Sequence, residues 1–402
     1  MRKLSERWPE HCAQPAESAH SIPPVFYTSD ELANAELETF FRGGWIGVGR
    51  ADMVRQPGDY ITLDLAGQNI ILLRDEAGAL RAHANSCRHR GTRLVDGSGS
   101  CKGLRCPFHC WYYKLDGTLK TAPRMEKACG FNKEDYGLVS YRAEERLGFA
   151  FICLSNHNDG NHTDGKHNDG NHNDGNHSTG IDDHLGDFAD IHSPWPLDGL
   201  ISVRRQEREV DCNWKAFLEV FNEYYHLPFV HAGSINAVYA KPDAADVVTG
   251  NYATQFGSTD GTGGLLQTEQ HKSLPGIPGL SGRAKEGARY TWVFPNMTFA
   301  ANLDALWCYE AYPLGASRCQ VVQTACFPSE TIDLPDFAEK SSAYLKRMDA
   351  ALDEDIVALS NQQKGLACPD ALPGRFQPEL EPNVAAFARW YSGVWADAQE
   401  SA

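Results

Sequence analysis

Long apolar runs, an excess of basic charge and a glycine-rich nucleotide fingerprint are all missing from this 402-residue sequence. No run of about 18 apolar residues occurs, so we expect no membrane-spanning helix. Asp and Glu outnumber Lys and Arg by 53 to 37. The resulting net charge of −16 argues against nucleic-acid binding, because phosphates need basic partners. No G-x-G-x-x-G follows a strand-like segment, so the chain is not expected to bind NAD(P)H itself.

Cysteine is present but is not arranged as in a small disulfide-rich protein. The 12 cysteines are scattered at irregular spacings. The first residues, MRKLSERWPEHCAQ, lack the apolar segment of a secretory signal, so we expect a cytoplasmic location. Cysteines stay reduced there, and clusters of Cys with His then indicate metal ligands rather than disulfides.

The texture of the sequence divides the chain into four segments. Residues 1–44 form an N-terminal segment that is expected to pack on the C-terminal domain. Within residues 24–45, a helix is predicted to start at the cap-like Ser29–Asp30 and to run to Gly43–Gly44. Residues 45–155 hold short alternating runs separated by turn residues, which predicts a small all-β domain. The predicted strands there are 60–65, 69–75, 78–85 and 148–154.

Residues 183–402 predict an α+β domain, an antiparallel sheet backed by helices. A strand is predicted over 202–210 and a helix over 214–226. A strand-rich stretch follows at 288–328, and a long helix begins near Pro335 and runs to about Gly365.

The remaining segment, residues 156–182, is a low-complexity insertion. Five copies of a five-residue unit carry His157, His162, His167, His172 and His177. A period of five matches neither a helix nor a strand, and the Asn, Asp and Gly content is typical of turns. We predict a flexible insertion; the alternative is a weak metal-binding tract, as in a metal-storage or metal-sensing protein.

Two loops of the predicted β domain each offer one thiol and one imidazole. SCRHRGT contains Cys87 and His89, and CPFHCWYY contains Cys106 and His109. Zinc modules usually pair Cys with Cys, whereas this mixture suits a Rieske [2Fe–2S] cluster, with two Cys on one iron and two His on the other. Structural zinc is the alternative.

These residues carry a family resemblance. NSCRHRGTRLVDG and LRCPFHCWYYKLDGTLKTAP resemble the Rieske domain of the Rieske non-heme iron oxygenases, the ring-hydroxylating oxygenase α-subunit family, whose usual form is N-x-C-x-H-R-G followed by C-P-Y-H-G-W. The resemblance implies that the C-terminal domain has a helix-grip fold. One departure is Cys110, where the family has Gly, and a Cβ there would affect the hydrogen bonding of the cluster.

A second constellation is NWKAFLEVFNEYYHLPFVH, with His226 and His231 five residues apart. Without other evidence this pattern is more typical of a polar helix face, with Tyr225 on the opposite, packing face. The segment is, however, similar to the one that supplies two His ligands to the family's mononuclear Fe(II). We expect Pro228 to end the helix and let His231 turn back.

The third ligand of such a site is a carboxylate, predicted to be Asp355. On a helix over 344–366, Asp355 falls inside the apolar stripe while Asp353 and Glu354 fall outside it. A carboxylate among apolar side chains is costly unless it binds a cation. The family's closing motif points to the same residue.

The resemblance also implies the function: a terminal oxygenase that hydroxylates a small organic substrate with O₂. Electrons would come from NAD(P)H only indirectly, through a separate reductase and, in some systems, a ferredoxin. A homotrimer is implied, and a separate β subunit stays open. A Rieske electron carrier without catalysis is a further alternative.

Two residues beside the iron ligands are predicted to be catalytic, Glu223 and Asn222. In the family an acidic residue at the position of Glu223 links the cluster of one subunit to the iron of the next. Glu there resembles members that oxidise quaternary ammonium compounds such as carnitine.

The stretch 289–313 is rich in aromatic residues, which more often form a sheet core than a cation-binding cage. We expect an aromatic substrate, with a quaternary or N-methylated amine as the alternative.

Overall fold

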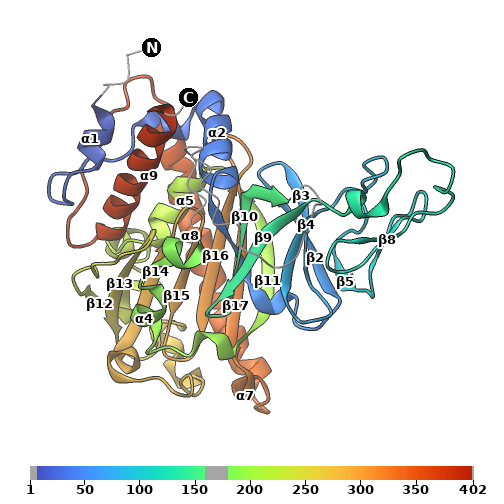
Figure 1. Ribbon diagram of the computed structural model, residues 1–402. Helices are drawn as coiled ribbons and strands as arrows, with labels where there is room; N and C mark the ends of the chain where they lie inside the picture. Colours follow the sequence, from blue (N-terminus) through green and yellow to red (C-terminus); the bar gives the residue numbers. More distant parts are fainter. Residues whose placement is uncertain (1–6, 159–179, 401–402) are drawn as a thin grey trace. The chain divides into compact units, whose positions relative to one another are not determined.

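The computed structural model describes residues 7–158 and 180–400 (Figure 1). The chain forms two compact units. Of the described residues, the larger unit comprises 7–39, 46–50 and 180–400, and the smaller comprises 40–45 and 51–158. Across the described ranges, no helix combines the length and apolar character needed to cross a membrane.

An antiparallel sheet forms the centre of the larger unit, with strand order β11-β17-β16-β15-β14-β13-β12. Its strands are β11 (Leu200–Val210), β12 (Tyr239–Pro242), β13 (Tyr252–Thr259), β14 (Gly287–Val293), β15 (Met297–Ala301), β16 (Leu306–Pro313) and β17 (Cys319–Pro328). β14 to β17 are almost completely buried because aromatic and β-branched residues fill both faces. The strands predicted over 202–210 and 288–328 are confirmed.

The larger unit also contains the helices of the described chain. They are α1 (Trp8–Cys12), α2 (Asp30–Glu36), α3 (Ile181–Leu185), α4 (Phe188–His192), α5 (Trp214–Phe221), α6 (Leu227–Val230), α7 (Ser329–Ile332), α8 (Phe337–Leu366) and α9 (Pro382–Glu400). α5 packs on β15 and β16, α9 packs on β13, and α8 contacts α5 and α6 (Figure 1). The long helix predicted from about 335 to 365 is confirmed as α8, whereas α9 and β13 were not predicted.

Short helical turns complete the described chain: η1 (Pro24–Tyr27), the π-turn η2 (Leu37–Arg42), η3 (Ala51–Met53), η4 (Lys133–Tyr136), η5 (Leu197–Gly199), η6 (Asn236–Val238), η7 (Gln267–Lys272) and η8 (Gly282–Glu286). The helix predicted from the Ser29–Asp30 cap to Gly43–Gly44 is confirmed, since α2 continues without a break into η2, which ends at Arg42; η1 is a separate turn before the cap. Its predicted cap is confirmed, because the Ser29 hydroxyl accepts a hydrogen bond from the Leu32 N–H at 3.3 Å.

A buried ionic network joins three helices of the larger unit. Glu36 of α2 accepts from the Lys215 ammonium at 2.6 Å, from the Trp214 indole at 3.0 Å and from the Tyr391 hydroxyl. Lys215 and Glu36 are both fully buried. Removal of one member of such a pair typically costs about 3–5 kcal/mol, so this network holds α5 firmly between α2 and α9.

The smaller unit contains a sheet in which the strands run in the order β10-β9-β4-β3-β2-β5. They are β2 (Asp59–Leu65), β3 (Gln68–Arg74), β4 (Leu80–Ala84), β5 (Ser98–Ser100), β9 (Ser140–Arg146) and β10 (Phe149–Asn158). A second sheet joins β6 (Leu104–Arg105), β7 (Tyr112–Tyr113) and β8 (Leu119–Thr121). β1 (Trp45–Arg50) precedes these strands.

The four strands predicted in this unit are present as β2, β3, β4 and β10, within a few residues of their predicted bounds. β10 extends into the first repeat, where His157 is paired with Tyr141 of β9. His162, His167, His172 and His177 lie outside the described residues.

Candidate metal centres

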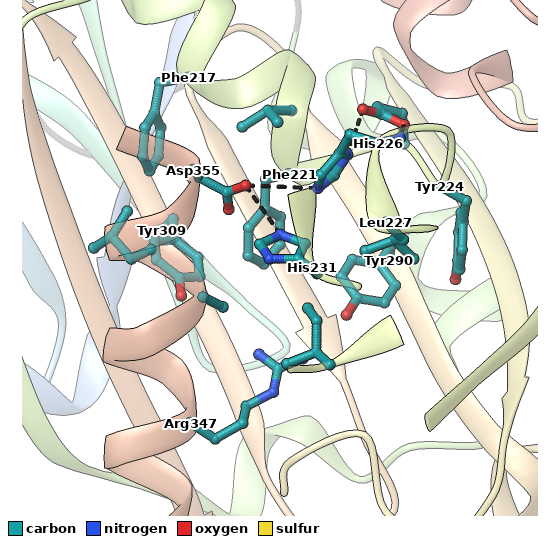
Figure 2. Close-up of a pocket in the computed structure, with 15 residues that line it drawn as sticks. Phe217, Phe221, Tyr224, His226, Leu227, His231, Tyr290, Tyr309, Arg347 and Asp355 are labelled. Carbon is teal, nitrogen blue, oxygen red and sulfur yellow. Dashed lines mark hydrogen bonds and ion pairs between the residues drawn. The ribbon is translucent and has the colours of Figure 1, made fainter. Parts of the chain in front are cut away.

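Three predicted ligands come together in the larger unit. His226 directly precedes α6, His231 directly follows it, and Asp355 lies in the middle of α8. Each residue contributes one potential ligand atom, and these three atoms all lie within 4.8 Å of one another. The Asp355 Oδ1 atom lies 3.0 Å from His231 Nε2 and 3.6 Å from His226 Nε2 (Figure 2).

The chain between the two histidines differs from its prediction. α5 ends at Phe221 rather than at residue 226, because Asn222 caps it with a non-helical backbone. Pro228 does not end a helix; it occupies the first turn of α6, where a missing N–H costs nothing. The short α6, rather than a reversal after Pro228, brings His231 back beside His226.

Carboxylates orient both imidazole rings from the outer side. Glu223 accepts from the His226 ring at Nδ1 and also contacts the His226 backbone N–H at 3.1 Å. Glu354 lies 2.5 Å from His231 Nδ1 and accepts from the Ser234 hydroxyl at 2.6 Å. Both Nε2 atoms therefore face Asp355, as expected when outer carboxylates set the tautomers of metal-binding histidines.

The electrostatics of this cluster favour a cation. Burial lowers the pKa of His231, but hydrogen bonds and charge from Asp355 and Glu354 outweigh burial and raise it. The field that attracts a proton also attracts a metal ion. Two imidazoles and one carboxylate on one side of a cavity form the donor set of non-heme Fe(II) oxygenases, so the residues fit that group.

A pocket adjoins the three residues. Its walls combine aliphatic side chains with five aromatic ones, which come from α5, the loop after α5, β14 and β16: Phe217, Phe221, Tyr224, Tyr290 and Tyr309 (Figure 2). The rings of Phe221 and Tyr309 are 4.4 Å apart, and those of Phe221 and Tyr290 are 5.5 Å apart.

Most of the aromatic stretch 289–313 is instead sheet core, as its composition indicates. Trp292, Phe294, Phe299, Trp307 and Tyr312 are buried and do not line this pocket. Only Tyr290 and Tyr309 of that stretch do so.

Asn222 lies beside the site but does not line the pocket. Its amide donates to the Leu218 carbonyl at 2.7 Å and accepts from the Thr298 hydroxyl at 3.0 Å. The side chain is 1% exposed. These contacts anchor the end of α5 to β15, which suits a positioning residue better than a catalytic one. Tyr225, expected on the packing face, is 48% exposed instead.

The other four predicted ligands lie in two loops of the smaller unit that have the same hydrogen-bond pattern. The Cys87 N–H donates to the Thr92 carbonyl at 2.9 Å, and the Cys106 N–H donates to the Trp111 carbonyl at 2.8 Å. In the same loops, the Gly91 N–H donates to the Cys87 carbonyl, and the Cys110 N–H donates to the Cys106 carbonyl. Each six-residue loop thus begins at a Cys and presents one His, two residues after Cys87 in the first loop and three residues after Cys106 in the second.

The two loops bring their ligands together. The rings of His89 and His109 are 4.6 Å apart. Their Nδ1 atoms are buried and have no hydrogen-bond partner. Buried unpartnered nitrogens are rare and require an explanation, and two of them in the loops that carry the buried Cys87 and Cys106 fit a cluster with imidazole ligands.

The cysteine environments agree with this fit. Burial raises the pKa of Cys87, whose sulfur lies 3.3 Å from the Tyr113 hydroxyl. At Cys106 burial also acts to raise the pKa, but backbone N–H groups of His109 and Phe108 outweigh it and lower the pKa. Such donors stabilise negative charge on sulfur. The 12 cysteines are all free, as expected.

Three contributors to these sites were not predicted. Glu354 was placed outside the stripe that holds Asp355, yet it contacts the adjacent ligand His231. Arg347 lines the pocket two helical turns before Asp355. Tyr113 lies beside Cys87 and accepts from the Arg88 N–H at 3.0 Å. The spacing of eight residues between Arg347 and Asp355 was a usable signal for a shared helix face.

Sequence comparisons match both units to known domains. Residues 44–142 match the family described as Rieske [2Fe-2S] domain. Residues 197–396 match that described as Ring hydroxylating alpha subunit (catalytic domain). The two matches imply a [2Fe–2S] cluster and a mononuclear iron that works with O₂.

Individual relatives are also found. The chain is 34% identical over 237 residues to the carnitine monooxygenase oxygenase subunit of Acinetobacter pittii, a match that spans 58% of each protein. It is 26% identical to the chloroplastic choline monooxygenase of Spinacia oleracea, over 94% of this chain and 78% of that one.

Solved structures share the fold over nearly the whole chain. The quaternary ammonium Rieske monooxygenase CntA, solved with L-carnitine, aligns with a TM-score of 0.76 at 25% identity and covers 98% of this chain and 99% of its own. Naphthalene 1,2-dioxygenase from Rhodococcus sp. aligns with a TM-score of 0.71 at 19% identity, covering 93% and 94%. With both domains present, the chain belongs to the Rieske non-heme iron oxygenases, the ring-hydroxylating oxygenase α-subunit family.

Proposed function

We propose that this protein is the terminal oxygenase component of a Rieske-type system that oxidises a quaternary or N-methylated ammonium compound. The observation that carries the proposal is an aromatic-walled pocket that opens directly onto His226, His231 and Asp355. An aromatic substrate was the expectation from the sequence. The carnitine and choline monooxygenases among the relatives favour the ammonium alternative.

The pocket chemistry supports this substrate class. A quaternary ammonium cannot donate hydrogen bonds, so it is recognised by aromatic faces, each contributing about 0.5–2 kcal/mol. Phe221, Tyr290 and Tyr309 supply such faces from two different elements, α5 and the sheet. The same walls would hold an aromatic ring through apolar contact alone, so the substrate screen below includes both classes.

The proposed ligands are His226, His231 and Asp355 for the mononuclear iron, and Cys87, Cys106, His89 and His109 for the cluster. The iron, when bound, supplies O₂ activation with electrons delivered through the cluster. The protein's own part is to position and to shield. Glu223 and Glu354 hold the two imidazoles in one orientation, while the aromatic walls exclude water and place the substrate next to the ligands.

The partners follow from the same proposal. A separate reductase, with or without a ferredoxin, would deliver electrons to the cluster. The working assembly would be a homotrimer in the cytoplasm, with Glu223 linking the cluster of one subunit to the iron site of the next. Within one chain, Glu223 already contacts His226.

Substrate-dependent O₂ uptake tests the function. The protein would be reconstituted anaerobically with iron and sulfide, supplied with a generic reductase, and screened with N-methylated amines against aromatic acids. We expect uptake matched by product only with the amines. Uptake and product formation only with aromatic acids would contradict the substrate class, and none with any substrate would contradict the oxygenase assignment.

A pair of variants isolates the aromatic wall. Phe221→Leu removes a ring and should raise the KM for an ammonium substrate by about 2- to 30-fold. Phe221→Tyr keeps the ring and should stay near the wild-type value. Equal effects of the two variants would contradict cation recognition by this wall.

A further inference from the structure

Arg347 places a positive charge inside the same pocket. It belongs to α8, lines the pocket together with Asp355, and is 3% exposed. Figure 2 shows its side chain reaching from α8 into the space below His231. One guanidinium nitrogen, Nη2, donates to the Tyr239 hydroxyl at 2.9 Å, and that hydroxyl lies 2.6 Å from the Tyr290 hydroxyl.

This guanidinium has no counter-ion. Its Nε atom is buried without a partner, and no carboxylate of the described chain lies within ion-pair distance of it. The neighbours are phenols, which burial keeps neutral by raising the pKa of Tyr290 and Tyr309. A buried charge without a partner costs several kcal/mol, and proteins seldom retain one unless something binds it.

Two other cations of this unit are paired with carboxylates. Lys215 lies 2.6 Å from Glu36, and Arg204 contacts Asp349 with two nitrogens at 2.7 and 2.8 Å. Among the described residues, Arg347 has no such carboxylate partner, unlike Lys215 and Arg204. Because the charge lies in the pocket wall, the partner expected there is a ligand.

We propose that Arg347 binds the carboxylate of the substrate, so that the substrate is a zwitterion with a quaternary ammonium at one end and a carboxylate at the other. This inference rests on the proposed function and narrows it. A guanidinium matches a carboxylate with paired hydrogen bonds, and a compound with no negative charge would leave Arg347 uncompensated.

The geometry of α8 sets the scale of this substrate. Arg347 and Asp355 are eight residues apart, or roughly 12 Å along the helix axis at 1.5 Å per residue. The long side chain of Arg347 spans part of that distance. A short chain of carbon atoms between the ammonium and the carboxylate fills the remainder, with the ammonium against Phe221 and Tyr309 and the carboxylate at Arg347.

Binding measurements on the fully loaded, anaerobic protein test the assignment without turnover. The ligands are betaines with one to four carbons between the charges, each compared with its methyl ester, which keeps the ammonium and loses the negative charge. By calorimetry we expect the best betaine to bind about 10- to 150-fold more tightly than its ester, the range for a hydrogen bond to a charged group.

Two substitutions separate charge from shape. Arg347→Gln should abolish the preference for the betaine over its ester. The affinity for the betaine should fall by the same factor, about 10- to 150-fold, and the affinity for the ester should change by no more than about threefold. Arg347→Lys should keep part of the preference because it keeps the charge. In steady state, Arg347→Gln should raise KM for the betaine much more than it lowers kcat.

The outcomes distinguish the two levels of the proposal. If the wild type bound esters and betaines equally tightly, or if Arg347→Gln lost affinity for both to the same extent, the role of Arg347 would be overturned. The proposed function as an oxygenase of ammonium compounds would still stand. Failure of the wild type to bind any ammonium compound would overturn the proposed function itself. Should Arg347→Gln not fold, the wild-type ratio of betaine to ester affinity decides.

Discussion

The backbone at Cys110 adopts a left-handed conformation, with φ of +58°. The equivalent position in the other cluster loop, four residues after its cysteine, is Gly91, with φ of +74°. A side chain raises the energy of this conformation by roughly 1–2 kcal/mol. The departure from the family's Gly is therefore a strained position that the surrounding loop holds in place.

Cys110→Gly should stabilise the loaded protein by about 1 kcal/mol, a rise of a few degrees in Tm, because glycine adopts this conformation without strain. Thermal unfolding measures it. The control is Cys129→Gly, also exposed but without a positive φ. A gain in the control as large as that in Cys110→Gly would contradict the explanation.

Glu223 has two separable roles at the residue scale: holding the His226 ring and linking subunits. We predict that Glu223→Gln keeps both metal centres, since an amide oxygen can still accept from His226, and lowers coupled turnover by at least about 10- to 100-fold. Iron analysis measures the first effect, and single-turnover reoxidation of the reduced cluster measures the second. Near-normal reoxidation would rule out the bridge.

At the scale of elements, α4 depends on a histidine that is buried and neutral. His192 lies 2.7 Å from the Phe188 carbonyl through Nδ1 and 2.8 Å from the Thr291 hydroxyl through Nε2. Burial lowers its pKa to about 3. With Nδ1 donating to the carbonyl, the neutral ring accepts from Thr291 of β14 at Nε2, and protonation would remove that acceptor, so this link between α4 and the sheet requires the neutral ring.

The sign of the resulting pH effect follows from linkage. Between about pH 3 and 6.5 the unfolded chain binds the proton that folded His192 does not, so stability falls as the pH falls through this window. At pH 5 the loss is about 2 kcal/mol relative to neutral pH. His192→Asn should flatten the pH dependence of the unfolding free energy by that amount. As a control, His271→Asn at an exposed position should keep the wild-type pH dependence of the unfolding free energy. If His192→Asn also kept that pH dependence, the prediction would be contradicted.

α5 shows where pattern analysis fails at this scale. Periodicity indicated one helix to residue 226, because the apolar spacing continues past the true end. The cap at Asn222 depends on Thr298, which is 76 residues away in the chain and enters only through the fold. The end of α5 determines where Glu223 and His226 lie, so the site depends on a contact that no local pattern contains.

For the whole molecule, the histidine repeat is expected to be dispensable for metal binding, because the seven proposed ligands all lie outside it. Replacement of residues 160–178 by a short Gly/Ser linker should leave about three irons per chain, two for the cluster and one for the mononuclear site. Iron and sulfide analysis measures this. Cys87→Ser, which should lose the cluster, is the control; loss of iron from the linker variant would show that the repeat takes part.

The sequence alone predicted the two domain types and five of the candidate ligands, because thiol–imidazole spacing and the position of Asp355 in an apolar stripe are local features of the chain. His226 and His231 were predicted from the family resemblance of their segment. Tertiary structure decided which other side chains complete the sites. Glu354, Arg347 and Tyr309 reach the pocket or the ligands from elements distant in sequence. Whether a charge such as Arg347 is paired or left for a ligand depends on what every neighbouring element contributes, and only the folded chain specifies that.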